Sequence, residues 1–272
     1  MTRSKSTTKA AGLERGSRAL YERPRYYDHA YRTLKADVAF YTELARDSGG
    51  PVLELGAGTG RITLGIARAG VDVVGLDQSA AMLARAKERI ASLPAEARQH
   101  IELRQGDLRK VRLRRRFALV IAPFNLFMHM FTRADIEQAL ATVQAHLAPR
   151  GRFAMDVLMP DLGTLRRDPE RVYRCRPVFD PTDGKRYAYG ESFDYDSVSQ
   201  VQTVRMMFQR IDRPELDHTT PLCLRFYFPE ELLALLHYNG FTLEQRFGGF
   251  DKSPFTEQSD NQVLVARPSR RR

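Results

Sequence analysis

The chain has 272 residues, 43% of them hydrophobic, with a net charge of +10 and an isoelectric point near 9.8. It contains no run of 18 apolar residues and no basic segment followed by an apolar signal core, so neither a membrane-spanning helix nor a secretory signal is expected. The two cysteines, Cys175 and Cys223, lack the paired spacing of a disulfide scaffold or a zinc site. These features predict a cytoplasmic α/β protein with one core and additions.

The first 20 residues are rich in Lys, Arg, Ser and Thr and lack hydrophobic periodicity, which predicts a disordered basic tail. A helical pattern follows over residues 30–45. Tyr27 and Tyr31 lie close to its start. Either tyrosine could contact a ligand, and packing into the core is an equally good interpretation.

A glycine-rich turn follows the first apolar strand, residues 52–55, and precedes a helix over residues 62–69. Its glycines, Gly56, Gly58 and Gly60, permit positive φ and a close approach of the backbone to a ligand. The helix that follows offers its free N–H groups to an anionic group. A dinucleotide-binding turn needs another glycine where this chain has Arg61, so the spacing disfavours NAD.

Acidic residues recur where the next two expected strands end. Asp77 follows the strand over residues 71–76, and Asp107 follows the strand over residues 101–105. Because ligands bind outside the carboxyl ends of strands in open α/β sheets, Asp77 is placed to accept hydrogen bonds from two ribose hydroxyls. A helix cap is the structural alternative for Asp77, although Ser79 is available for that role.

The fourth strand, residues 117–121, is followed by a segment of mixed polarity that includes Pro123, Asn125 and His129. Asn125 and His129 are four residues apart, so they share a face if a helix follows the strand. A histidine here can act as a base near neutral pH. The alternative is a partly buried histidine that hydrogen-bonds a backbone carbonyl.

The run from Val52 to Met130 resembles the core of class I S-adenosylmethionine-dependent methyltransferases. The Asn and His after the fourth strand resemble, more narrowly, glycine N-methyltransferase and the sugar N-methyltransferases of antibiotic pathways. The resemblance implies catalytic or substrate-orienting roles for His129 and Asn125. It also implies contacts with S-adenosylmethionine, or with its product S-adenosylhomocysteine, for Tyr27, Glu54, Gly56, Ala57, Gly58, Thr59, Gly60, Arg61, Asp77, Gln78, Met82, Gly106, Asp107, Leu108, Pro123 and Phe124.

After a fifth strand over residues 152–158, alternating β-branched and aromatic residues predict an antiparallel sheet from segments 171–178, 185–195, 198–211 and 222–228. By residue type, Tyr31, Arg225 and Tyr227 are candidates to contact the acceptor. A helix over residues 229–238 and strands over 241–247 and 261–266 then close the core.

The expected fold is therefore a Rossmann-like seven-stranded methyltransferase sheet, with helices on both faces and an inserted antiparallel β cap. The expected division of the chain is a tail over residues 1–20, a cofactor-binding core over 21–159, the cap over 160–228, completion of the core over 229–267 and a basic tail over 268–272.

The expected activity is transfer of a methyl group to a nitrogen, or an oxygen, of a small molecule without a metal. Six of the eight residues from Arg109 to Arg116 are basic, so an RNA methyltransferase is the main alternative. No nucleic-acid-binding motif accompanies these residues, which makes nucleic acid the less favoured partner. A non-catalytic protein that binds the cofactor, and association as a homodimer, remain open.

Overall fold

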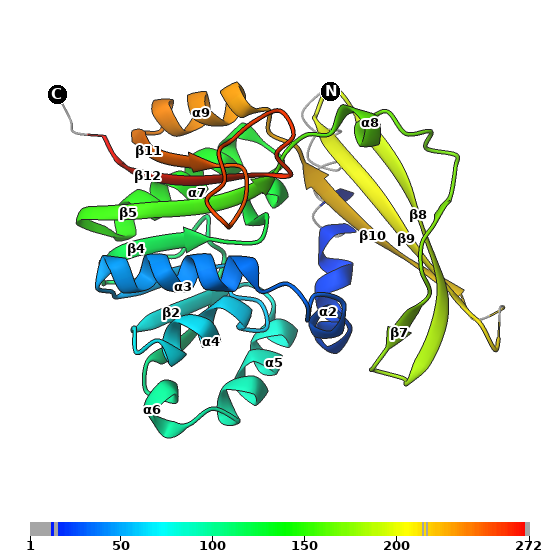
Figure 1. Cartoon of the computed structure of the whole chain (residues 1–272), viewed down its shortest axis with the longest axis horizontal. Coiled ribbons are helices and arrows are strands. Elements are labelled where there is room, and N and C mark those ends of the chain that lie inside the picture. The colour runs from blue at the N-terminus through cyan, green and yellow to red at the C-terminus, as the bar shows by residue number, and fades with distance from the viewer. Residues whose placement is uncertain (1–11, 14–15, 214, 216, 270–272) are drawn as a thin grey trace. The chain divides into compact units, whose positions relative to one another are not determined.

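The computed structural model describes residues 12–13, 16–213, 215 and 217–269, and it divides the chain into two compact units (Figure 1). The larger unit contains residues 34–159 and 227–272, and the smaller unit contains residues 1–33 and 160–226. The expected boundaries differ from these, because residues 21–33 group with the antiparallel sheet. Of the expected tails, residues 1–11, 14–15 and 270–272 lie outside the described residues, whereas residues 16–18 have helical backbone.

The larger unit is built on a seven-stranded sheet with the order β11-β12-β5-β4-β1-β2-β3. Strands β1 to β5 run parallel to one another, and β12 is antiparallel to both β5 and β11. The strands span Val52–Leu55 (β1), Val73–Asp77 (β2), Ile101–Gln105 (β3), Phe117–Ala122 (β4), Leu147–Leu158 (β5), Phe241–Phe247 (β11) and Asn261–Pro268 (β12). Every residue of β1 is buried, as the apolar sequence of a central parallel strand predicts.

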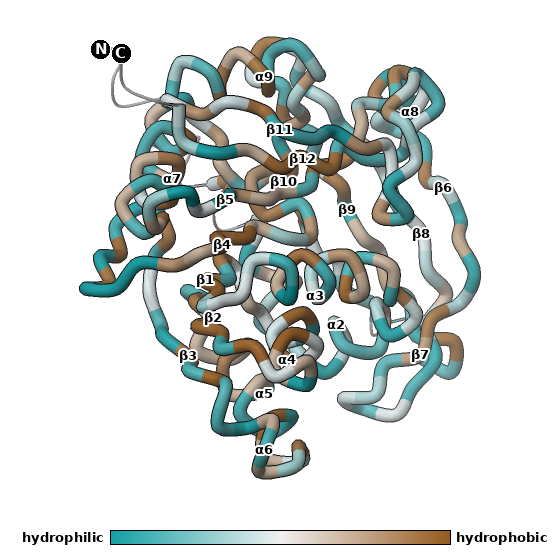
Figure 2. The backbone as a smooth tube through the Cα atoms, turned by 60° about the vertical axis from the view of Figure 1, so that its left-hand side comes forward, coloured by the Kyte–Doolittle hydropathy of each residue, from teal (hydrophilic) through white to brown (hydrophobic). Residues whose placement is uncertain are grey.

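Helices connect these strands and pack on the sheet. They are α3 (Ala36–Ser48), α4 (Arg61–Arg68), α5 (Ala80–Ala91), α6 (Ala95–Arg98), the 3₁₀ turn η2 (Leu126–His129), α7 (Arg133–His146) and α9 (Pro229–Tyr238). Phe40, Tyr41 and Leu44 of α3 pack in one hydrophobic cluster with Val52 of β1 and Leu119 of β4. The tube in Figure 2 is accordingly mostly brown, the hydrophobic end of its scale, along the central strands.

The smaller unit contains an antiparallel sheet with the order β10-β9-β8-β6, to which β7 adds by pairing with β8. The strands are β6 (Tyr173–Arg174), β7 (Val178–Asp180), β8 (Lys185–Asp196), β9 (Val201–Arg210) and β10 (Asp217–Arg225), and the helices are η1 (Ala19–Glu22), α2 (Pro24–Ala30) and α8 (Leu162–Leu165). Tyr26 of α2 packs edge-on against Phe208 of β9, with ring centres 5.5 Å apart. This unit therefore has an aromatic core of its own.

The seven-stranded sheet and the separate antiparallel sheet confirm the expected fold class. The helix expected over residues 30–45 corresponds to α3, which begins only at Ala36; residue 30 is the last residue of the separate helix α2. Within the described part of the chain, no helix is both long and apolar enough to span a lipid bilayer.

Candidate active site

The glycine turn adopts the backbone that its sequence predicts. Gly56, Gly58 and Gly60 have φ angles of 68°, 55° and 81°, a region that residues with a Cβ rarely adopt. A Cβ at Gly56 would lie 2.6 Å from Cδ1 of Leu126, and a Cβ at Gly58 would lie 3.3 Å from Cε of Met82. The turn is therefore in close contact both with α5 and with the η2 turn that follows β4.

Asp77 joins the ends of three neighbouring strands. Its carboxylate accepts hydrogen bonds from the backbone N–H of Gly58 (2.8 Å) and of Ser79 (2.7 Å), and its carbonyl accepts from Gly106 N–H (2.9 Å). Burial raises the pKa of Asp77, although the backbone hydrogen bonds oppose the rise. The N-cap of α5 is Ser79, whose side chain accepts a hydrogen bond from Met82 N–H. Asp77 is therefore not the residue that caps this helix.

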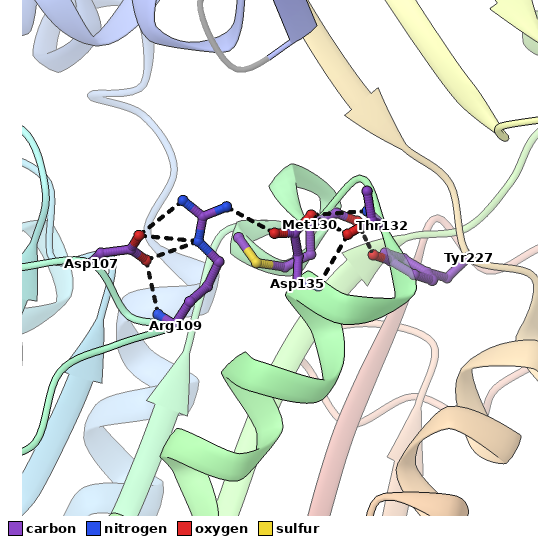
Figure 3. Close-up of polar contacts among 6 residues, drawn as sticks. All are labelled: Asp107, Arg109, Met130, Thr132, Asp135 and Tyr227. Atoms are coloured by element: carbon purple, nitrogen blue, oxygen red, sulfur yellow. Dashed lines mark hydrogen bonds and ion pairs between the residues drawn. The ribbon is translucent and has the colours of Figure 1, made fainter. Parts of the chain in front are cut away.

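Asp107 is held by Arg109 in a polar network that reaches helix α7 (Figure 3). The Arg109 guanidinium donates to both oxygens of Asp107, at 2.9 to 3.1 Å, and to Asp135 at 2.8 Å. Partial burial would raise the pKa of Asp107, but the hydrogen bonds from Arg109 outweigh it and lower the pKa. Asp107 is therefore a fixed, ionised acceptor at the end of β3.

Several expected cofactor residues are held by their own neighbours. Glu54 is fully buried and accepts a hydrogen bond from the Thr63 hydroxyl, and its burial raises its pKa to about 8. Thr59 is buried and accepts from Arg89 through its hydroxyl (3.0 Å) and its carbonyl (3.1 Å).

The side chain of Arg61 is paired with Asp37 at the start of α3, with N···O distances of 2.5 and 2.6 Å. Its guanidinium also lies 4.9 Å from the ring centre of Phe124. Arg61 thus links α3, α4 and the segment after β4.

The remaining expected residues lie along the same edge of the sheet. Ala57 donates its N–H to the Leu76 carbonyl (2.9 Å), and the Gln78 carbonyl accepts from the Gln105 side chain (3.2 Å). Leu108 follows Asp107 directly and is partly buried, and Pro123 is buried at the end of β4.

The condition under which Asn125 and His129 would share a helix face, an α-helix directly after β4, is not met. Phe124 and Asn125 have φ angles of 57° and 62°, and only the four residues of η2 follow. The cause is Asp156 on β5, whose carboxylate accepts from the N–H groups of both residues (2.8 and 3.0 Å). His129 is the last residue of η2 and is partly buried. The Oδ1 atom of Asn125 is buried and has no hydrogen-bond partner among the described residues.

Tyr227 lies in the same unit, where it anchors η2. Its side chain is fully buried, and its hydroxyl donates to the carbonyls of Met130 (2.6 Å) and Phe127 (3.1 Å), as Figure 3 shows for Met130. Tyr27, Tyr31 and Arg225 belong to the smaller unit. There the rings of Tyr27 and Tyr31 pack edge-on at 4.8 Å, and Arg225 donates to Gln200 at 3.4 Å. Ligand contacts for these three residues remain predictions.

Comparison with known families indicates what kind of domain contains these candidate site residues. The family model described as a methyltransferase domain matches residues 52–151. These residues are a methyltransferase domain. They include the glycine turn, Asp77, Asp107 and the whole segment from Pro123 to His129.

Two curated relatives match the chain over 121 residues each. The dTDP-3-amino-3,4,6-trideoxy-alpha-D-glucopyranose N,N-dimethyltransferase of Streptomyces venezuelae is 27% identical over 44% of this chain and 48% of its own length. The glycine/sarcosine N-methyltransferase of Halorhodospira halochloris is 34% identical over 43% of this chain and 43% of its own length. The match thus spans about half the length of these relatives or less.

Solved structures extend the likeness beyond the methyltransferase domain. The CcbJ methyltransferase of Streptomyces caelestis superimposes with a TM-score of 0.75 over 86% of this chain and 90% of its own, at 24% identity. Other structures of the same fold are S-adenosylmethionine-dependent methyltransferases. The chain therefore has the fold of that class, which agrees with the resemblance seen in its sequence.

Sequence reasoning missed the residues that hold this edge together. They are Asp37, Tyr41, Arg89, Arg109, Asp135 and Asp156. Asp156 could have been singled out from the sequence, because it is an acidic residue inside the apolar strand 152–158, as Glu54 is inside the strand 52–55. The contacts of Arg109 and Arg89 join segments 26 and 30 residues apart and left no local pattern.

Proposed function

We propose that the protein transfers a methyl group from S-adenosylmethionine to a nitrogen of a small molecule, and that nucleotide-linked amino sugars and glycine-like amines are the first acceptors to test. The observation that carries the proposal is the glycine turn joined to Asp77 through Gly58 N–H. N-methylation is supported by the two relatives described above, whose names specify methyl transfer to an amino sugar and to glycine or sarcosine.

The residues present fit S-adenosylmethionine. Gly56 and Gly58 have positive φ angles, and a Cβ on either would meet Leu126 or Met82, so the turn needs glycine at both positions to follow this path at the end of β1. Both oxygens of Asp77 accept backbone N–H groups, and a carboxylate has about four acceptor sites, so Asp77 can also accept from a ribose hydroxyl. The buried Oδ1 of Asn125 is a further acceptor in the neighbouring segment.

When bound, S-adenosylmethionine supplies a methyl group on a positively charged sulfur, and the protein has to align the acceptor with it. Alignment of two reactants contributes roughly 7 to 11 kcal/mol to lowering such a barrier. An acceptor amine that arrives protonated must first lose a proton, and His129 is the candidate to remove it. Asn125 is the candidate to orient the amine, because its amide both donates and accepts hydrogen bonds.

Calorimetry with S-adenosylmethionine and S-adenosylhomocysteine tests the binding half of the proposal. We expect Asp77→Ala to weaken binding at least tenfold, because a hydrogen bond to a charged group contributes about 1.5 to 3 kcal/mol. Asp72→Ala is the matched control, since Asp72 is an exposed acid that precedes the same strand and pairs with His100 at 2.7 Å. A wild-type protein that gives no heat, or an Asp77→Ala variant that binds normally, would overturn the proposal.

Formation of S-adenosylhomocysteine in the presence of sarcosine or a dTDP-amino sugar tests the catalytic half. We expect His129→Ala to lower kcat by about 100- to 10,000-fold, the usual contribution of a general base. The Kd of S-adenosylmethionine should stay within about twofold of the wild-type value. His237→Ala, which alters an exposed histidine on α9, is the control. Equal losses of kcat and of cofactor affinity would mean that His129 is structural.

A further inference from the structure

A buried carboxylate on β5 underlies the segment that carries Asn125 and His129. Asp156 is 1% exposed, and it accepts hydrogen bonds from the Tyr41 hydroxyl (2.6 Å), Phe124 N–H (2.8 Å) and Asn125 N–H (3.0 Å). An isolated buried charge is strongly unfavourable, and these three donors satisfy it. Asp156 therefore depends on the conformation of this segment as much as the segment depends on Asp156.

The two N–H groups that Asp156 accepts belong to residues with unfavourable backbone conformations. Phe124 and Asn125 have positive φ angles, at which a side chain is strained. Such strain persists only where the surroundings fix it, and it concentrates at functional sites. One carboxylate that receives both N–H groups provides this fixation directly.

The η2 turn that follows is held at two further points by neutral groups. Tyr227 donates its hydroxyl to the carbonyls of Phe127 and Met130. Leu126 packs against Gly56, where a Cβ would come within 2.6 Å of it. Asp156 is the charged member of these three anchors, and it acts at the start of the segment, beside Asn125.

We propose that Asp156 is a positioning residue for methyl transfer: by binding the N–H groups of Phe124 and Asn125, it fixes the backbone that presents Asn125 and His129 to the acceptor. The inference rests on the proposed function. Tyr41 assists from α3 by holding the carboxylate in place.

The arrangement also makes the positioning depend on pH. Burial raises the pKa of Asp156 to about 6, and the hydrogen bonds from Tyr41, Asn125 and Phe124 oppose the rise. Besides Tyr41, Asp37 of α3 acts on this carboxylate, and its negative charge adds to the rise. Protonation places a hydrogen on one oxygen, so that oxygen accepts less well from the N–H that faces it, and the segment is loosened. Activity should fall as the pH drops through about 6.

Two variants separate this effect from the titration of histidine, which falls in the same pH range. Asp156→Asn keeps the size but places an amide against N–H donors, so kcat should fall at least tenfold at pH 8 while the Kd of S-adenosylmethionine stays within about threefold. Tyr41→Phe keeps the two N–H groups that bind Asp156 but removes a hydrogen bond that lowers the pKa of Asp156. It should move the acidic limb of the kcat profile upward by about one pH unit.

Hydrogen exchange of the free protein gives a readout that needs neither cofactor nor acceptor. Backbone N–H groups of Phe124 and Asn125 should exchange at least tenfold faster in Asp156→Asn. Asp260→Asn, which alters an exposed acid beside β12, should leave exchange and kcat unchanged.

The proposal fails if Asp156→Asn retains wild-type kcat, or if kcat and cofactor affinity fall together. If Asp156→Asn does not fold, Tyr41→Phe decides alone, and an unmoved acidic limb overturns the proposal. A wild-type protein that neither binds S-adenosylmethionine nor turns over would instead refute the proposed function, which distinguishes the two failures.

Discussion

Buried acids inside apolar strands are the most informative single residues of the larger unit. Glu54 on β1 is 1% exposed, and it accepts a hydrogen bond from the Thr63 hydroxyl of α4. Asp156, in contrast, has three donors. The difference explains why burial raises the pKa of Glu54 to about 8 but that of Asp156 only to about 6.

The raised pKa of Glu54 predicts how stability varies with pH. A folded-state pKa near 8, against 4.5 for the free group, stabilises the fold fully below pH 4.5, and this stabilisation is lost as the pH rises through 8. Glu54→Gln cannot lose a proton but still accepts from Thr63. We therefore expect its free energy of unfolding to exceed that of the wild type by a few kcal/mol at pH 9, since one pKa unit corresponds to about 1.4 kcal/mol.

Urea denaturation at pH 5, 7 and 9 measures this difference. Glu88→Gln is the control, because Glu88 is exposed and forms an ion pair with Arg85 one helical turn away. A Glu54→Gln variant that loses stability in parallel with the wild type from pH 5 to 9 would show that Glu54 is not the group responsible.

Among the elements, helix α7 has the clearest local determinant. Thr132 accepts from Asp135 N–H (3.1 Å), and Asp135 accepts from Thr132 N–H (3.0 Å), so the two residues form a capping box. Asp135 also binds Arg109, which links this helix start to Asp107 at the end of β3 (Figure 3). The start of α7 therefore stabilises both the helix and the position of Asp107.

Thr132→Ala should lower the free energy of unfolding by about 1 kcal/mol, the usual cost of losing an N-cap side chain. Thr132→Ser retains the hydroxyl and should be nearly neutral. Urea denaturation of both variants checks the expectation. A similar loss in the two variants would mean that the methyl group of Thr132, rather than the cap, provides the stabilisation.

The elements also show where sequence patterns suffice. Strands β1, β3 and β11 lie at the residues expected, because continuous apolar or alternating patterns bounded by turn residues define them locally. Pro and Asn-Gly likewise mark the two ends of α9. The segment after β4 was not predictable in this way, because its conformation depends on Asp156, 31 residues beyond Asn125 in the chain. Tertiary contacts of this kind leave no periodic signal.

At the scale of the whole molecule, the net charge of +10 is the property that the proposed function does not use. In the basic run from Arg109 to Arg116, several side chains bind the protein itself. Arg109 pairs with Asp107 and Asp135, Arg112 donates to Thr142, and Arg116 donates to the Leu147 carbonyl. Arg115 lies 3.8 Å from Glu102. Much of this charge therefore binds β3, α7 and the start of β5.

Titration with a single-stranded RNA at several salt concentrations tests whether the exposed basic side chains of this run bind nucleic acid. Binding through about six phosphates weakens steeply with ionic strength, with a log–log slope near −4, whereas a small acceptor should respond little. We expect any RNA binding to be weak at 150 mM salt and to leave the Kd of S-adenosylmethionine unchanged. The double variant Lys110→Ser, Arg114→Ser removes two exposed cations of the run. It should reduce RNA binding without lowering turnover of the amine. Methylation of the RNA itself, lost in this double variant, would instead identify nucleic acid as the acceptor.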